Sequence, residues 1–150
     1  MTPTDSSPDD AQSLLVSILR QGPYLIASIH TALDDSELVR FQRDLIARVG
    51  RDRARGVIID VAALDVLDSF AANTLSTLAR MTALRGAATV IVGISPEIAY
   101  SMVQLGLRLD AVPTALDLDE GLSELGRLTG TGFGRPTGRG SFGRPMRPPR

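Results

Sequence analysis

Short apolar runs alternate with amphipathic helical patterns along the middle of this 150-residue chain. The runs Tyr24 to Ile29, Val57 to Ile59 and Ala88 to Val92 have the length and the β-branched content of buried strands. Between them, apolar residues recur at the three- and four-residue spacing of a helix face. Strands that alternate with helices pair mostly in parallel, because each helix returns the chain to the start of the next strand. The pattern predicts an α/β fold: a mixed, mostly parallel sheet of four to five strands, flanked by about four helices.

Turn and capping residues set the first boundaries. Arg20-Gln21-Gly22-Pro23 separates the apolar runs Leu14 to Leu19 and Tyr24 to Ile29, and this spacing predicts an opening β-hairpin. Asp34, with a glutamate three residues later, predicts a capping box at the start of the first helix. Gly50 is typical of a residue that ends a helix.

The second half of the chain carries similar signals. Ser95-Pro96 predicts a helix N-cap followed by an N1 proline, and Gly106 predicts the end of that helix. Its apolar positions are Ile98, Met102 and Leu105. We expect a brief last strand near Leu109 to Val112. Asp117 and Glu120 then predict a capping box for a terminal helix.

Both ends of the chain differ in composition from the middle. Residues 129–150 contain six Gly, four Pro, five of the sixteen Arg, no acid, and the sequence Phe-Gly-Arg-Pro twice. Such a segment buries too little apolar surface to offset its conformational entropy, so we expect a disordered tail. Residues 1–12 are predicted to be a flexible N-terminus, which leaves one domain over residues 13–128. Residues 1–128 together carry a net charge near −6, since the tail accounts for five positive charges. The basic tail is expected to be inert or weakly electrostatic, with contacts to RNA or to acidic surfaces as the alternative.

Several kinds of site are excluded or disfavoured by composition. The absence of cysteine and lysine excludes disulfides, thiolate metal sites, P-loops and Schiff-base chemistry. His30 is the only histidine, and one histidine without cysteine cannot form a common zinc site. No cofactor is predicted. The acidic, Pro/Ser-rich N-terminus is unlike a secretory signal, and no apolar run approaches the roughly 20 residues of a membrane helix. We therefore expect a cytoplasmic protein.

The segment Asp60 to Phe70 is the strongest candidate for a functional site. It follows a predicted buried strand, contains Asp60, Asp65 and Asp68, and leads into a helical pattern at Ser69. Ser69 is expected to be the N-cap of that helix. The three carboxylates could form a magnesium site, but a strand-end aspartate followed by a solvated acidic loop is the favoured interpretation.

A serine at a helix N-terminus suits reversible phosphorylation. Phosphate would add about −1.5 to −2 charges at Ser69, and the helix dipole stabilises negative charge there. A partner docked on the same loop would have to bury that charge beside Asp68. The fold should therefore tolerate the modification that an interface would not, which is what a binding switch requires.

The loop through Leu67-Asp68-Ser69-Phe70 resembles the phosphorylatable loop of STAS domains, the anti-sigma factor antagonist fold. Further segments strengthen this resemblance: Leu15-Val16-Ser17-Ile18, Gly93-Ile94-Ser95-Pro96-Glu97-Ile98-Ala99, and Thr114 to Leu122. Together they look like the single-domain, RsbS-type proteins of stressosomes. The resemblance covers roughly residues 13–128.

The resemblance implies a phosphoprotein without catalytic activity that acts in a stress response. Such proteins assemble with RsbR-type STAS sensors into a homo-oligomer or a large hetero-oligomer, and they hold an RsbT-type switch serine kinase until it phosphorylates the STAS serine. Ser69 matches that serine, Asp68 and Phe70 match its neighbours, and Asp65 belongs to the same partner-binding loop. Ser101 lies near a second modified position of some sensor proteins. The alternatives are a direct anti-sigma factor antagonist that binds an anti-sigma kinase, or a STAS module that binds a small ligand or nucleic acid.

Overall fold

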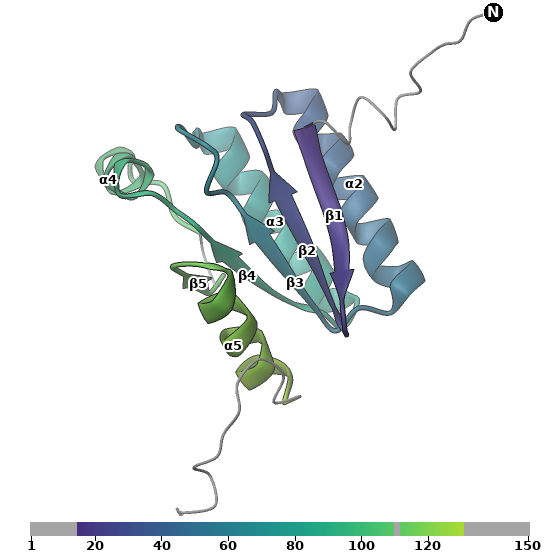
Figure 1. The fold of residues 1–150 in the computed structure, drawn as a ribbon. Coiled ribbons are helices and arrows are strands. Elements are labelled where there is room, and N and C mark those ends of the chain that lie inside the picture. Colours follow the sequence, from purple (N-terminus) through teal and green to yellow (C-terminus); the bar gives the residue numbers. More distant parts are fainter. Residues whose placement is uncertain (1–14, 110–111, 131–150) are drawn as a thin grey trace, which may run out of the picture.

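A computed structural model describes residues 15–109 and 112–130 (Figure 1). Within these residues the elements follow the predicted order of strands and helices. They are β1 (Val16–Gln21), β2 (Tyr24–Ile29), α2 (Asp35–Asp52), β3 (Gly56–Asp60), α3 (Ser69–Leu84), β4 (Ala88–Val92), α4 (Pro96–Leu105), β5 (Thr114–Ala115) and α5 (Leu118–Thr129). The predicted α/β class is confirmed.

The five strands form one mixed sheet in the order β1-β2-β3-β4-β5. β1 and β2 form the predicted antiparallel hairpin, with Gln21 opposite Tyr24, and all later pairs are parallel. β3 and β4 therefore lie in the interior of the sheet, as their continuous apolar runs require.

Side chains that alternate along each strand build a core on both faces of the sheet. Val57 and Ile59 of β3 point toward α2 and α3, whereas Ile58 points toward α5. Figure 1 shows α2 and α3 on one face and α5 on the other. α4 lies to the side of the sheet, where its Ile98 and Met102 belong to the larger core cluster. Both faces of the central strands are thus covered, and the loops after β3 and β4 meet at one edge.

The first helix begins where its capping box predicts but ends later. Asp34 accepts the N–H of Glu37, and Glu37 Oε1 accepts the N–H of Asp34, both at 2.8 Å. The expectation that Gly50 ends the helix is wrong, because α2 continues to Asp52 and Arg53 is its left-handed C-cap. A Cβ added to Gly50 would lie 1.8 Å from Nη2 of Arg85. The glycine therefore makes room for the side chain of Arg85, the C-cap residue of α3.

The last strand and part of α4 also differ from prediction. β5 lies at Thr114–Ala115 rather than near Leu109 to Val112, since it is defined by pairing with Ile91 and Val92 of β4. Leu105, predicted on the apolar face of α4, is exposed, while Ile98 and Met102 are buried. α5 ends at Thr129, one residue beyond the predicted domain end. The predicted flexible N-terminus and the tail from residue 131 lie outside the described residues.

Candidate functional site

The loop between β3 and α3 lies at the edge where the parallel strands end. Val61 continues the sheet, because its N–H donates to the carbonyl of Val92 at 3.0 Å. Asp60 turns the chain away from the sheet, with Oδ1 accepting the N–H of Ala62 at 2.9 Å. The Asp60 carboxylate is therefore engaged by the loop itself.

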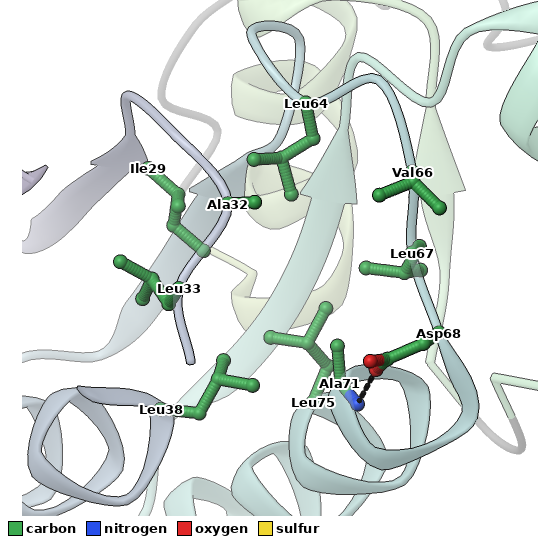
Figure 2. Close-up of a pocket in the computed structure, with 10 residues that line it drawn as sticks. All are labelled: Ile29, Ala32, Leu33, Leu38, Leu64, Val66, Leu67, Asp68, Ala71 and Leu75. Atoms are coloured by element: carbon green, nitrogen blue, oxygen red, sulfur yellow. Dashed lines mark hydrogen bonds between the residues drawn. The ribbon is translucent and has the colours of Figure 1, made fainter. Parts of the chain in front are cut away.

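Asp68, and not Ser69, caps α3. Asp68 has extended backbone angles, φ −83° and ψ 178°, and its Oδ1 accepts the N–H of Ala71 at 2.8 Å (Figure 2). Ser69 is the first helical residue, so the expectation that it is the N-cap is wrong. Two adjacent residues of good capping type stand at this position, and the fold uses the first. The Ser69 hydroxyl is exposed and makes no hydrogen bond among the described residues.

Buried leucines hold the loop in place while its polar residues face solvent. Leu64 and Leu67 are buried, at 7% and 4% exposure. Between and after them Asp65 is exposed, and Val66 and Phe70 are 59% and 38% exposed. The four predicted partner-binding residues, Asp65, Asp68, Ser69 and Phe70, are thus all at the surface of one continuous segment.

The loop after β4 packs against the same segment. Gly93 has φ +86°, and a Cβ added there would lie 2.8 Å from Cβ of Ala62 and 2.9 Å from its N. The chain then enters α4 through Ser95, whose Oγ accepts the N–H of Ile98 at 3.2 Å. This close contact places the Gly93 to Ile98 segment beside the Asp60 to Phe70 loop.

A small apolar pocket of about 50 Å³ opens beside the cap (Figure 2). One wall comes from the β2–α2 connection and the start of α2, and the other from the β3–α3 loop and α3. Its lining residues are Ile29, Ala32, Leu33, Leu38, Leu64, Val66, Leu67, Asp68, Ala71 and Leu75. Asp68 is the one charged residue in that lining, so the pocket is apolar with an acidic rim. Its volume suits one side chain better than a metabolite.

Negative charge dominates this edge of the sheet. Within the described residues, the loops after β2, β3, β4 and β5 and the helix starts that follow them carry ten carboxylates and no arginine. Every helix except α4 begins with an aspartate cap. The ten carboxylates are Asp34, Asp35, Glu37, Asp60, Asp65, Asp68, Glu97, Asp117, Asp119 and Glu120. Hydrogen bonds from the N–H of Glu37 and from the hydroxyl of Ser36 hold the pKa of Asp34 below its usual 3.8. The edge therefore favours a partner surface that is not acidic.

Other candidate residues take no part in the site. His30 is exposed at the end of β2, with Nε2 3.0 Å from Oγ of Ser17. Ser101 is exposed on α4. Among the described residues, no three His, Asp or Glu side chains are grouped closely enough to hold a metal ion. No helix in the described part of the chain is both long and apolar enough to cross a membrane.

The sequence did not indicate that the β2–α2 connection forms one wall of the pocket. Ala32, Leu33 and the exposed Val66 line the pocket, and none of them was predicted to belong to the site. Their position could have indicated it, because Ala32 and Leu33 follow β2 and the carboxyl ends of parallel strands meet at one edge of the sheet. Tyr100 and Val103 of α4, which are 69% and 80% exposed, were also not identified.

Comparisons with known proteins agree with this geometry. The sequence model of the STAS domain family matches residues 16–121 of this chain. RsbRA of Bacillus subtilis, described as an RsbT co-antagonist protein, is 30% identical over 97 residues. That match covers 65% of this chain but only 35% of RsbRA, so the chain spans about a third of that relative.

Several solved structures resemble this chain in both fold and sequence. A variant of Moorella thermoacetica RsbS with a serine-to-glutamate substitution is 34% identical, with a TM-score of 0.65, over 75% of this chain and 96% of that one. A chain from a structure of the stressosome, described as a signal integration and transduction hub, is 29% identical, with a TM-score of 0.60, over 75% and 97%. Anti-sigma factor antagonists share the fold at 11 to 18% identity.

Proposed function

This chain belongs to the STAS-domain family, and on that basis we propose that it is a non-enzymatic, phospho-regulated scaffold of a stressosome-type complex. It holds an RsbT-type switch serine kinase on the edge formed by the β3–α3 loop and releases it when Ser69 is phosphorylated. One observation carries the proposal: Ser69 is exposed at the first position of α3, and its hydroxyl has no structural task because Asp68 provides the cap.

The fold should accept phosphate at this position. The first N–H groups of a helix have no intrahelical partner, and Asp68 engages that of Ala71 only. A phosphate on Ser69 would lie at the positive end of the helix dipole, where negative charge is stabilised by about 0.3–1 kcal/mol. Because the hydroxyl makes no hydrogen bond among the described residues, no native contact would be lost.

A docked kinase should not accept it. Val66 and Phe70 give the surface exposed apolar area beside the pocket, and Asp65 and Asp68 surround it with negative charge. Such a surface fits a partner with an apolar centre and basic rim. Phosphorylation would place a dianion inside this interface, where desolvation is costly.

The proposed partners follow from the relatives. RsbRA is described as an RsbT co-antagonist protein, and a chain of a stressosome structure is 29% identical to this one. We therefore include RsbR-type STAS sensors and a large hetero-oligomer in the proposal. The carboxylates give no support to catalysis, since Asp60 and Asp68 each accept a backbone N–H of their own loop. A direct anti-sigma antagonist is the weaker candidate, because identity to those proteins is 11 to 18%.

The test combines modification with release. The purified chain is incubated with an RsbT-type kinase and ATP, and phosphate is located by peptide mass spectrometry. We expect it on Ser69 and not on Ser101, with loss of the kinase from the immobilised chain. Ser69→Ala should retain the kinase in the presence of ATP. Phosphate on other residues with Ser69 unmodified would contradict the proposal.

The size of the assembly separates the two candidate functions. Mixed with an RsbR-type paralogue, the chain should sediment as a particle far larger than a dimer. A direct antagonist would stay a monomer or dimer and would bind an anti-sigma kinase instead.

A further inference from the structure

The end of the domain opposite the carboxylate-rich edge, called the acidic edge from here on, is rich in arginine. Six exposed arginines lie there, at the hairpin turn, just before β3, and at the carboxyl ends of α2, α3 and α5. We call this surface the arginine end; it consists of Arg20, Arg51, Arg53, Arg55, Arg85 and Arg127. The two ends of the strands therefore carry opposite charge.

Contacts between distant segments bring these arginines together. The N–H of Arg55 donates to the carbonyl of Pro23 in the hairpin turn at 2.8 Å, and its Nη2 donates to the carbonyl of Thr129 in α5 at 3.3 Å. The side chain of Arg85 lies against Gly50 near the end of α2. The hairpin turn and three helix ends thus meet at one end of the domain.

The domain neutralises only part of this positive charge. Asp52 and Glu124 are the two carboxylates in the described segments that form the arginine end. Asp52 pairs with Arg48 at 2.9 Å, and Glu124 pairs with an arginine of its own helix. Arg53 and Arg85 are exposed and form no ion pair within the described residues. Their charge is therefore available to an acidic partner.

The acidic edge has the features that such a partner needs. Asp35 and Asp65 are exposed there and accept no hydrogen bond among the described residues. Both surfaces also expose apolar side chains, Val66 and Phe70 at the acidic edge and Leu84 at the arginine end. An apolar centre with a polar rim is typical of protein interfaces, and rims of opposite charge favour contact.

We propose that the arginine end binds the acidic edge of a second copy of this chain. The second copy is the occupant because this chain itself carries both the complementary charge and the matching apolar area. Arg53 and Arg85 face the carboxylates of the neighbour, and Leu84 contacts its exposed apolar residues. The inference concerns the chain alone and does not depend on the proposed kinase.

The contact is head-to-tail. Its two surfaces lie at opposite ends of the strands, so two copies cannot make both contacts with each other. A heterologous contact of this kind leaves one free surface at each end of the assembly, and further copies can add there. The acidic edge is also the proposed kinase surface, so a neighbouring copy and the kinase exclude each other.

The test is sedimentation velocity of the full chain alone, at about 0.01–0.5 mM protein and at about 50 and 500 mM salt. We expect species larger than a dimer that grow with protein concentration at the lower salt. They should be lost at the higher salt, because screening weakens contacts between exposed charges. Arg51→Glu/Arg85→Glu and Asp35→Arg/Asp65→Arg should each weaken association about ten-fold or more.

Mixing these two variants tests the head-to-tail geometry. The first keeps an intact acidic edge and the second keeps an intact arginine end. The mixture should therefore associate at least to a dimer, with an affinity near that of the unsubstituted chain, although neither variant associates alone. The matched control is Arg40→Glu/Arg43→Glu, which changes the net charge equally in α2 away from the arginine end and should alter association less than about two-fold.

Two milder changes cover the case in which a charge reversal disturbs folding. Arg20→Ala/Arg53→Gly should weaken association about three-fold or more, and glycine fits the φ of 52° at position 53. Leu84→Gln should weaken it about ten-fold without changing its salt dependence, because an apolar contact is lost.

Several results would overturn the proposal. They are a chain that stays monomeric at the lower salt, an assembly that stops at a dimer, and a mixture of the two reversed variants that does not associate. Association lost equally in the α2 control would also contradict it, as would association that survives both arginine substitutions and disappears when residues 131–150 are removed.

Discussion

Asp68 and Ser69 are adjacent in the chain but have separate tasks. The Asp68 carboxylate accepts the N–H of Ala71 at 2.8 Å and begins α3, while the Ser69 hydroxyl stays exposed and without a hydrogen-bond partner among the described residues. The residue that caps α3 is thus not the residue that we propose is phosphorylated.

Ser69→Ala should therefore leave stability almost unchanged. We expect the free energy of unfolding to differ from that of the unsubstituted chain by less than about 0.5 kcal/mol, because neither a cap nor a buried contact is lost. Urea unfolding followed by circular dichroism measures this. A loss of about 1 kcal/mol would mean that Ser69 contributes to the cap after all.

Asp68→Ala should destabilise the domain instead. Removing the cap costs about 0.5–2 kcal/mol, whereas Asp68→Asn should retain most of it. Asp65→Ala is the matched control: it removes a carboxylate three residues earlier that accepts no hydrogen bond among the described residues. Equal unfolding midpoints for Asp65→Ala and Asp68→Ala would argue against the cap.

Ser69→Asp should fold normally and bind the kinase about ten-fold or more weakly. Its carboxylate stands at the positive end of α3, where it is tolerated, but inside the proposed interface, where it is not. Ser101→Asp adds the same charge on α4 and should bind within about two-fold of the unsubstituted chain. Calorimetric titration with the kinase distinguishes them, and equal weakening by both would indicate a nonspecific charge effect.

Gly93→Ala should cost more than Gly86→Ala. Both glycines have positive φ, +86° and +88°, so both substitutions carry the same backbone strain. Only at Gly93 does a Cβ meet other atoms, 2.8 Å from Cβ of Ala62. We expect an additional loss of about 1–3 kcal/mol in thermal unfolding and a displaced β3–α3 loop. Equal losses would show that the Ala62 contact adapts freely.

Acid should remove part of the stabilisation at the start of α2. The pKa of Asp34 is lowered by the N–H of Glu37, so its contribution is present above the unfolded value and is lost as pH falls through the lower folded value. Asp34→Asn keeps a capping oxygen but does not titrate, so its urea midpoint should fall less than that of the unsubstituted chain below about pH 4. Asp44→Asn, in the middle of α2, is the control, and its urea midpoint should fall with pH as much as that of the unsubstituted chain.

Much of this fold was predictable because its signals are local. The capping box of Asp34 and Glu37 operates within three residues, and the hairpin turn at Gly22-Pro23 acts between neighbouring strands. The apolar run of β3 indicated an interior strand because its alternate side chains must be buried on both faces. The acidic loop was also visible, since it directly follows that strand.

The predictions that were wrong concern features that depend on residues distant in sequence. Asp68 and Ser69 have similar capping propensity, and the burial of Leu67 fixes the approach to α3 so that Asp68 takes the extended conformation. α2 continues through Gly50, where the side chain of Arg85, the C-cap residue of α3, lies against it. β5 forms where β4 offers a pairing edge, at Thr114 opposite Ile91, and not where the local sequence is most apolar.

The sequence by itself therefore determined the order of elements, the hairpin, most caps and the position of the acidic loop, because periodicity and capping act over a few residues. Tertiary structure alone decided that Ala62 meets Gly93, that an apolar pocket opens beside Asp68, and that arginines from three helix ends gather opposite that pocket. Those relationships arise when parallel strands align their carboxyl ends at one edge, which brings together loops that no local pattern connects.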